Sequence, residues 1–123
     1  PCLARPGFVV AGAGELVDGA LTESGIVRRG ETGPEALAAK MDFVLKVIEE
    51  RLSGLHASWA ETTAVVAYTA HVPPQPALLQ LWARLGAAAG THGLQWVLSR
   101  PPVTGIEYEM DARGCPQEIT LLT

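Results

Sequence analysis

The segment 31–54 constrains the fold more than any other part of the sequence, because its apolar residues recur at helical spacing along one face. Thr32 is the expected N-cap, Pro34 suits the first helical turn, and Gly54 suits a left-handed C-cap. The apolar stripe consists of Leu37, Met41, Val44, Leu45, Ile48 and Leu52. A helix of about five to six turns with one apolar face must pack against another apolar layer.

That second layer is predicted to be a β-sheet. The segment 61–71, ETTAVVAYTAH, is rich in β-branched residues and is followed by prolines, which is typical of a central strand. In 105–112, Ile106, Tyr108 and Met110 alternate with acidic residues, and this period of two indicates a half-buried strand. The remaining expected elements are strands at 7–15, 25–27 and 94–99, and a helix from Pro76 to about Ala88 with an inner stripe of Leu78, Leu81, Trp82 and Leu85.

The order of these elements is β-β-α-β-α-β-β, which predicts a single α+β domain over residues 1–123. Two helices on one face of a mixed sheet would bury both apolar stripes. Within 64–69 both sets of alternating positions are fairly apolar, so the second face of the sheet also needs cover. A lone domain would expose this surface, and we therefore expect the chain to form oligomers.

The composition excludes several classes of partner. The chain carries a formal net charge of -4, and its acidic and basic residues are interspersed, so a nucleic-acid partner is not expected. No apolar run approaches the roughly 20 residues that a membrane span needs. No signal peptide is evident, and we expect a cytoplasmic protein that does not associate with membranes.

The two cysteines, Cys2 and Cys115, lie near opposite ends of the chain. Neither belongs to a CxxC motif or to a histidine cluster, so no metal site is expected. Reduced thiols are the simplest interpretation for a cytoplasmic protein. A disulfide would require the fold to bring the two ends together.

Three segments of the sequence resemble, in this order, motifs of the RidA (YjgF) family. VAGAGE stands where the family has an apolar strand ending in Ser-Gly, with Ala11 in the serine position and Gly12 in the glycine position. TTAVVAYTAH resembles the threonine-rich strand of the family. RPPVTGIEYEMDA resembles its closing signature, a proline turn followed by an I-E-x-E-x-x-A strand. The resemblance covers about residues 7–113.

This resemblance implies a chorismate-mutase-like fold and a homotrimer with ligand clefts between neighbouring subunits. It also implies a small-molecule ligand or substrate and no cofactor. Active members of the family hydrolyse reactive enamines and imines to 2-oxo acids and ammonia. In them an arginine pairs with the substrate carboxylate, and a glutamate of the closing strand helps to place water.

Glu107 and His92 are the candidate catalytic residues. Glu107 matches the first glutamate of the closing motif, where a carboxylate can orient water or accept a proton. The family's arginine position falls on His92, and Arg100 follows the strand candidate instead of preceding it, so we interpret the arginine clamp as absent. His92 can bind a carboxylate when protonated, or act as an acid or base near neutral pH. The simpler interpretations are a strand residue facing outward and a loop histidine, and Glu109 is interpreted as a surface or interface residue.

Four further residues are candidates for substrate binding. Gly12 and Ala13 would place free backbone N–H groups at the end of the first strand, where such groups can bind an oxyanion. Tyr68 and His71 lie near the end of the central strand, where they could line a cleft. The simpler interpretations are a plain turn for the first pair, a core aromatic for Tyr68 and a solvated strand end for His71.

Three interpretations of the function remain open at this point. The first is a divergent imine or enamine hydrolase (deaminase) that uses Glu107, and the second is a metabolite-binding protein of the same fold without catalysis. The third is a tautomerase-like enzyme in which the secondary amine of Pro1 is the base or nucleophile, although residues 4–7 separate it from the first strand. The missing arginine favours a changed substrate or a lost activity over ordinary imine hydrolysis.

Overall fold

The computed structural model describes residues 6–17 and 23–123, so the expectations for Pro1 and Cys2 lie outside the described residues. Its strands are β1 (Phe8–Gly14), β2 (Ala64–Thr69), β3 (Gln95–Leu98) and β4 (Glu109–Gly114). Its helices are α1 (Pro34–Gly54), α2 (Gln75–Leu85) and α3 (Ala87–His92), with short 3-10 turns at η2 (Glu23–Gly25) and η3 (Trp59–Glu61).

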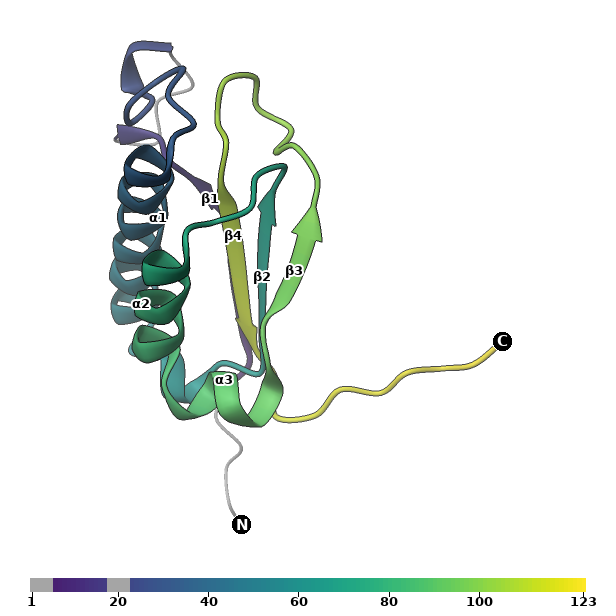
Figure 1. The fold of residues 1–123 in the computed structure, drawn as a ribbon. Coiled ribbons are helices and arrows are strands. Elements are labelled where there is room, and N and C mark those ends of the chain that lie inside the picture. The colour runs from purple at the N-terminus through teal and green to yellow at the C-terminus, as the bar shows by residue number, and fades with distance from the viewer. Residues whose placement is uncertain (1–5, 18–22) are drawn as a thin grey trace.

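The four strands form one mixed sheet in the order β1-β4-β2-β3. β4 is antiparallel to both β1 and β2, whereas β2 and β3 are parallel and are joined by α2 and α3. Figure 1 shows α1 and α2 side by side on one face of this sheet, with α3 at the end where β3 begins. The α+β class and the two helices on one face were both predicted, and both are confirmed.

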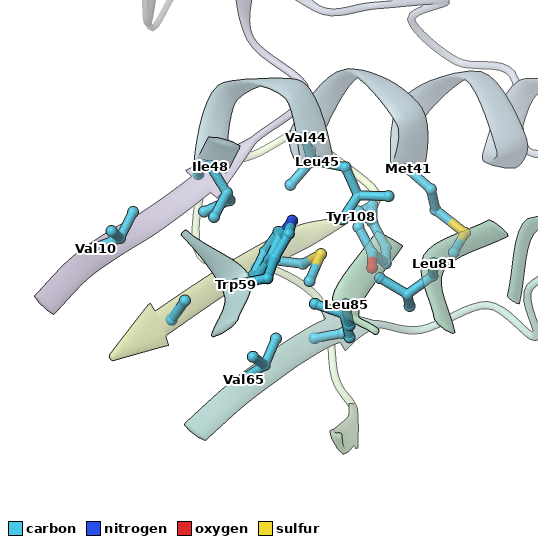
Figure 2. Close-up of a cluster of buried hydrophobic side chains, with 14 of the residues drawn as sticks. Val10, Met41, Val44, Leu45, Ile48, Trp59, Val65, Leu81, Leu85 and Tyr108 are labelled. Carbon is cyan, nitrogen blue, oxygen red and sulfur yellow. The ribbon is translucent and has the colours of Figure 1, made fainter. Parts of the chain in front are cut away.

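The long helix α1 buries the whole stripe that the sequence predicts. Each of its six residues is buried, and all of them except Leu37 belong to the main core cluster together with inward side chains of β1, β2 and β4. Figure 2 shows Met41 and Leu45 of α1 on one side of Tyr108, and Leu81 and Leu85 of α2 on the other. The core therefore lies between the helical layer and one face of the sheet.

The ends of α1 differ from the prediction. Its N-cap is Gly33, which makes no side-chain cap hydrogen bond, and Pro34 occupies the first turn as expected. Gly54 is the last helical residue, and the left-handed conformation falls on His56, at a φ of 55°. The Leu55 and Ala57 amides bond to carbonyls of the last helical turn, so the chain closes the helix without a glycine there.

The predicted strand at 25–27 is wrong. Only an isolated antiparallel bridge between Leu16 and Ile26 forms there, supported by a 2.9 Å hydrogen bond from the Val27 amide to the Glu15 carbonyl. Arg28 then adopts a positive φ of 47°, which turns the chain away before a second pair can form. The described part of the chain therefore has one strand before α1.

The second helix was predicted as one element, and it is two. Gly86, at a φ of 60°, separates α2 from α3, because a left-handed residue cannot continue a right-handed helix. Leu81 and Leu85 face the core as predicted, but Leu78 and Trp82 are partly exposed. Ala77 takes their place, since the buried stripe runs through positions 77, 81 and 85.

The last strand is shifted toward the C-terminus relative to the prediction. Its ladder begins at Glu109 instead of Gly105 and continues to Gly114. The alternation itself is confirmed, because Ile106, Tyr108 and Met110 are all buried and the acidic residues between them are not. The period of two thus begins at Ile106, before the hydrogen-bonded ladder does.

Tyr108 is the bulkiest fully buried side chain, at 1% exposure. Its ring lies 6.1 Å from that of Trp96, and no hydrogen-bond partner for its hydroxyl exists among the described residues. Burial raises the pKa of Tyr108, so the phenol stays neutral. A buried hydroxyl without a partner loses its hydrogen bonds to water on folding and gains nothing in return.

We predict that Tyr108→Phe leaves the free energy of unfolding unchanged or raises it by up to about 1 kcal/mol, because removal of an unpaired hydroxyl removes its desolvation cost. Urea denaturation measures this change. Tyr68→Phe is the matched control, since the Tyr68 hydroxyl donates a 3.0 Å bond to Asp111 and its loss should cost about 0.5–1.5 kcal/mol. If Tyr108→Phe is less stable than Tyr68→Phe, the Tyr108 hydroxyl has a hydrogen-bond partner in solution and the prediction is wrong.

Candidate functional site

Three side chains converge beside the sheet, where β2 and β3 end and the approach to β4 begins. The His71 Nε2 atom lies 2.6 Å from the Glu107 Oε2 atom, and the Arg100 Nη1 atom lies 3.7 Å from the same oxygen. The Glu107 side chain is 13% exposed, whereas that of Arg100 is 74% exposed. We call His71, Arg100 and Glu107 the Glu107 cluster.

The topology of the sheet brings this cluster together. Parallel strands β2 and β3 end at the same edge, where the Ser99 amide bonds to the Thr69 carbonyl at 3.1 Å. His71 and Arg100 each follow one of these strands by two residues. Because β4 is antiparallel to β2, the start of β4 lies beside the end of β2, and Glu107, two residues before β4, lies at the same edge. Residues distant in sequence therefore meet without any special loop.

The Glu107 cluster has the chemical groups for proton transfer next to a carboxylate-binding group. An imidazole and a carboxylate in direct contact can pass a proton between them or to a bound water. The Arg100 guanidinium makes only one long contact with Glu107 and leaves most of its donors in solvent. A guanidinium placed in this way can receive the carboxylate of a ligand in a bidentate arrangement.

A buried ion pair fixes the backbone at Glu107. Glu15 and Lys40 are both 0% exposed, with 3.2 Å between the Lys40 Nζ and Glu15 Oε1 atoms. The Glu15 carboxylate also accepts the backbone amides of Glu107 at 2.5 Å and Tyr108 at 3.0 Å, and Lys40 donates to the Val27 carbonyl at 2.8 Å. Glu15 therefore takes the place of a strand partner for the two residues before β4, which explains the late start of its ladder.

A cleft of about 650 Å³ lies between the β1 edge, α1 and the segment before β4. Its lining includes Gly12, Gly14, Phe43, Val47, Ile106 and Glu109. Here β1 departs from regular pairing between Val10 and Ala13, and Arg51 donates to the Ala11 and Gly12 carbonyls at 3.1 and 3.5 Å. Neither this cleft nor a second cavity of about 670 Å³, around Phe8, Leu55 and Cys115, is lined by a member of the Glu107 cluster.

The structure does not bring all of the predicted site residues together. His71 and Glu107 are in direct contact, and Tyr68 lies on β2 with its hydroxyl bonded to Asp111. Burial and that bond raise the pKa of Tyr68. Gly12 and Ala13 both line the cleft, with the Ala13 side chain buried. His92 ends α3 before β3 begins, so within one subunit it lies at the opposite end of the strand from Glu107.

Sequence reasoning missed two features of the site. Arg100 was set aside because it follows a strand, but residues that follow two parallel strands meet at one edge, and that rule could have placed it beside His71. The Glu15–Lys40 pair gave no signal, because its members are 25 residues apart and their contact depends on how α1 packs.

The described residues offer no obvious site for a metal. Across residues 6–17 and 23–123, no group of three or more His, Cys, Asp or Glu side chains is placed to hold a metal ion. Cys115 carries a free thiol. Among the same residues, none of the helices is long and apolar enough to cross a membrane.

The fold defines the class of protein. YyfB from Yersinia pestis, a protein of the conserved Rid family, superposes with a TM-score of 0.55 at 18% identity, covering 92% of this chain and 80% of that one. The yeast protein YEO7 superposes with a TM-score of 0.54 at 16% identity, covering 90% and 80% of the two chains. The chain therefore has the chorismate-mutase-like fold of the Rid proteins, as its motifs predicted.

Sequence comparison places the chain more narrowly. The family model described as 2-aminomuconate deaminase CnbZ matches residues 2–119. The 2-amino-5-chloromuconate deaminase of Comamonas testosteroni is 41% identical over 123 residues, an alignment covering 95% of this chain and 46% of that protein. The chain belongs to this CnbZ family. It spans about half the length of this curated relative.

We predict that Lys40→Met and Glu15→Gln each lower the free energy of unfolding by about 3–5 kcal/mol, because removal of one partner disrupts a buried ion pair. The double variant Glu15→Gln/Lys40→Met should be more stable than Lys40→Met, since it buries no charge. Urea denaturation of all four proteins gives the coupling energy. Lys46→Met is the control, because its exposed pair with Asp42 should contribute about 0.3–0.5 kcal/mol. Additive losses in the cycle would contradict direct coupling.

Proposed function

We propose that this chain deaminates a small unsaturated 2-amino acid of the 2-aminomuconate type by hydrolysis, with the Glu107 cluster as its catalytic site. The observation that carries the proposal is the 2.6 Å contact between His71 and Glu107 in a chain of the CnbZ family. The glutamate is the one that the closing motif of the Rid proteins singles out. We further propose that the reaction takes place in the cytoplasm and needs no cofactor.

The proposed reaction has three steps and consumes one water. A proton adds to carbon of the enamine, the C=C electrons form the new C–H bond, and the nitrogen lone pair forms the C=N bond of an imine. Water adds to the imine carbon and loses a proton, which gives a carbinolamine. The carbinolamine hydroxyl then loses its proton to the site as its oxygen forms the C=O bond, the C–N bond breaks, and the nitrogen, protonated by the site, leaves as ammonia. The products are a 2-oxo acid and ammonia.

Each member of the cluster has a role in this scheme. Glu107 accepts a proton from the attacking water, and a positioned base typically contributes about 100- to 10,000-fold to the rate. His71 relays that proton to the departing nitrogen, because it contacts Glu107 directly. Arg100 pairs with the substrate carboxylate in place of the arginine that the family carries before the strand.

A second part of the proposal concerns assembly. We propose a homotrimer whose ligand clefts lie between subunits, with the sheet face opposite α1 and α2 turned inward. Ala64, Val66 and Tyr68 point to that face, because Val65 and Ala67 between them are buried under the helices. The exposed Val9 and Leu98, on the two edge strands, add apolar surface that an isolated domain would leave in water.

Two alternatives make different predictions. A metabolite-binding protein of this fold would retain a ligand without turning it over, and the mostly solvated Arg100 is compatible with that role. A tautomerase-like reaction would depend on Pro1, which lies outside the described residues, and it stays a prediction. We favour the deaminase because a binding site alone has no need for a histidine and a glutamate in direct contact.

The first test is ammonia release from freshly prepared 2-aminomuconate. Glu107→Gln is expected to lower kcat at least about 100-fold, because the amide cannot accept the proton from water. Arg100→Gln should raise KM about tenfold or more, since a charge-assisted hydrogen bond contributes about 1.5–3 kcal/mol. His56→Asn, which changes a histidine outside the cluster, should behave like wild type. Ammonia release no faster than the spontaneous rate would sink the proposal, and ligand retention would then test the binding alternative.

His92→Ala tests the remaining catalytic candidate and the assembly together. In a single subunit His92 is too far along β3 to reach Glu107, so a loss of activity would require a neighbouring subunit to supply it. Light scattering at micromolar concentration should give three times the mass of the 13.0 kDa chain. A monomer mass would contradict both the trimer and the inter-subunit cleft.

A further inference from the structure

Glu109 stands on the same side of the sheet as Glu107, one strand period further along. The residues that alternate with them, Tyr108 and Met110, are buried beneath the helices, so both glutamates face the other way. Positions two residues apart on a strand lie about 7 Å apart. The two carboxyl groups diverge from there: Glu107 reaches His71, whereas Glu109 reaches Gly12 on β1.

The Glu109 carboxyl occupies a space that a glycine provides. A Cβ atom on Gly12 would collide with the Glu109 Oε1 atom, so any other residue at position 12 would displace this side chain. The carboxyl is half-buried and lines the 650 Å³ cleft. Among the described residues it has no hydrogen-bond or ion-pair partner, in contrast to Glu107. A carboxyl group placed in this way faces a ligand cavity with both oxygens available.

The charges around Glu109 favour its protonated form. On β4 and in the turn after β1, Asp111 and Glu15 are both acidic. Burial, together with the negative charges of these two residues, raises the pKa of Glu109 above that of an ordinary glutamate. On β2, the register partner Tyr68 donates its hydroxyl to Asp111.

The charged groups on α1 do not favour the ionised form of Glu109 by pairing with it. Arg51 uses its Nη1 atom on the Ala11 and Gly12 carbonyls, and Lys46 pairs with Asp42 at 2.7 Å. Glu50, which also lines the cleft, adds another acid. No basic side chain in the described part of the chain therefore forms an ion pair with Glu109.

We propose that Glu109 is the acid that delivers the proton to carbon when the bound enamine becomes an imine, while Glu107 is the base in the later addition of water. This inference rests on the proposed function and assigns a residue to its first step. The Glu109 O–H bond breaks, the C=C electrons of the enamine take the proton, and the nitrogen lone pair forms the C=N bond. Glu109 is left as a carboxylate and regains a proton from solvent through the cleft.

The division of labour follows from the two environments. Glu107 contacts both His71 and Arg100, which suits it to the later step that takes a proton from water. A half-buried carboxyl without a cationic partner is a poor site for the extra negative charge, which suits Glu109 to the donation of a proton. Pairs of carboxyl groups whose environments differ in this way commonly divide the acid and base roles.

The experiment compares a substrate that needs the first step with one that does not. 2-Aminoacrylate is an enamine and requires protonation at carbon, whereas 2-imino-2-phenylacetate has no hydrogen on the carbon beside the C=N group and enters directly as an imine. Glu109→Gln is expected to slow the enamine at least about tenfold and the imine less than about twofold. Glu107→Gln should slow both, and Glu118→Gln, an exposed glutamate paired with Arg113, should slow neither.

Equal slowing of both substrates by Glu109→Gln, or of neither, would overturn the inference. Gly12→Ala is a second variant, because a methyl group there displaces the Glu109 carboxyl, and it should reproduce the selective loss on the enamine. If wild type accelerates the imine and not the enamine, the acid role of Glu109 is likewise excluded.

A direct titration separates this inference from the proposed function. Side-chain ¹³C NMR of wild type should show Glu109 titrating above the ordinary glutamate range, and Asp111→Asn should lower that midpoint because one of the neighbouring negative charges is removed. A midpoint at or below the ordinary range would overturn the inference whatever the activity. If wild type accelerates neither substrate and releases no ammonia from 2-aminomuconate, the proposed function fails, and with it the role of Glu109 as its acid.

Discussion

The carboxylate of Glu15 joins the helical layer to the candidate site. It is fully buried, it pairs with Lys40 of α1, and it accepts the two backbone amides that precede β4. Those amides would otherwise be buried without partners, which costs about 1–3 kcal/mol each. The position of the Glu107 backbone therefore depends on an ion pair in the interior. Buried pairs contribute little net stability, so this one is better explained by the geometry it imposes.

Most of the fold could be predicted from local patterns. The apolar stripe of α1 and the alternation at 106–110 identify inward residues correctly, because burial against a single layer leaves a clear period in a sequence. The errors arise where tertiary contacts decide. A side chain replaces a strand partner before β4, and the positive φ of Arg28 cuts off the pairing that begins at Leu16.

The site was only partly predictable. The closing motif pointed to Glu107 and the end of the central strand pointed to His71, but nothing local shows that the two touch. Their contact, like the position of Arg100, follows from the pairing of β2 with β3 and β4, which is a property of the whole sheet. Glu109 was interpreted as a surface residue because its side chain faces away from the core. What distinguishes it is the absence of a side chain at Gly12, a contact between residues 97 positions apart.

The site has one fixed half and one that is open to change. Glu107 is held by the interior, whereas His71 and Arg100 stand on segments that connect strands to their neighbours, and Arg100 is mostly in solvent. Connecting segments tolerate substitution and changes in length at little cost in stability. If the proposed roles hold, a lineage can keep the carboxylate that handles protons and exchange the cation that selects the acid. An arginine placed after a strand instead of before it is one outcome that such drift would produce.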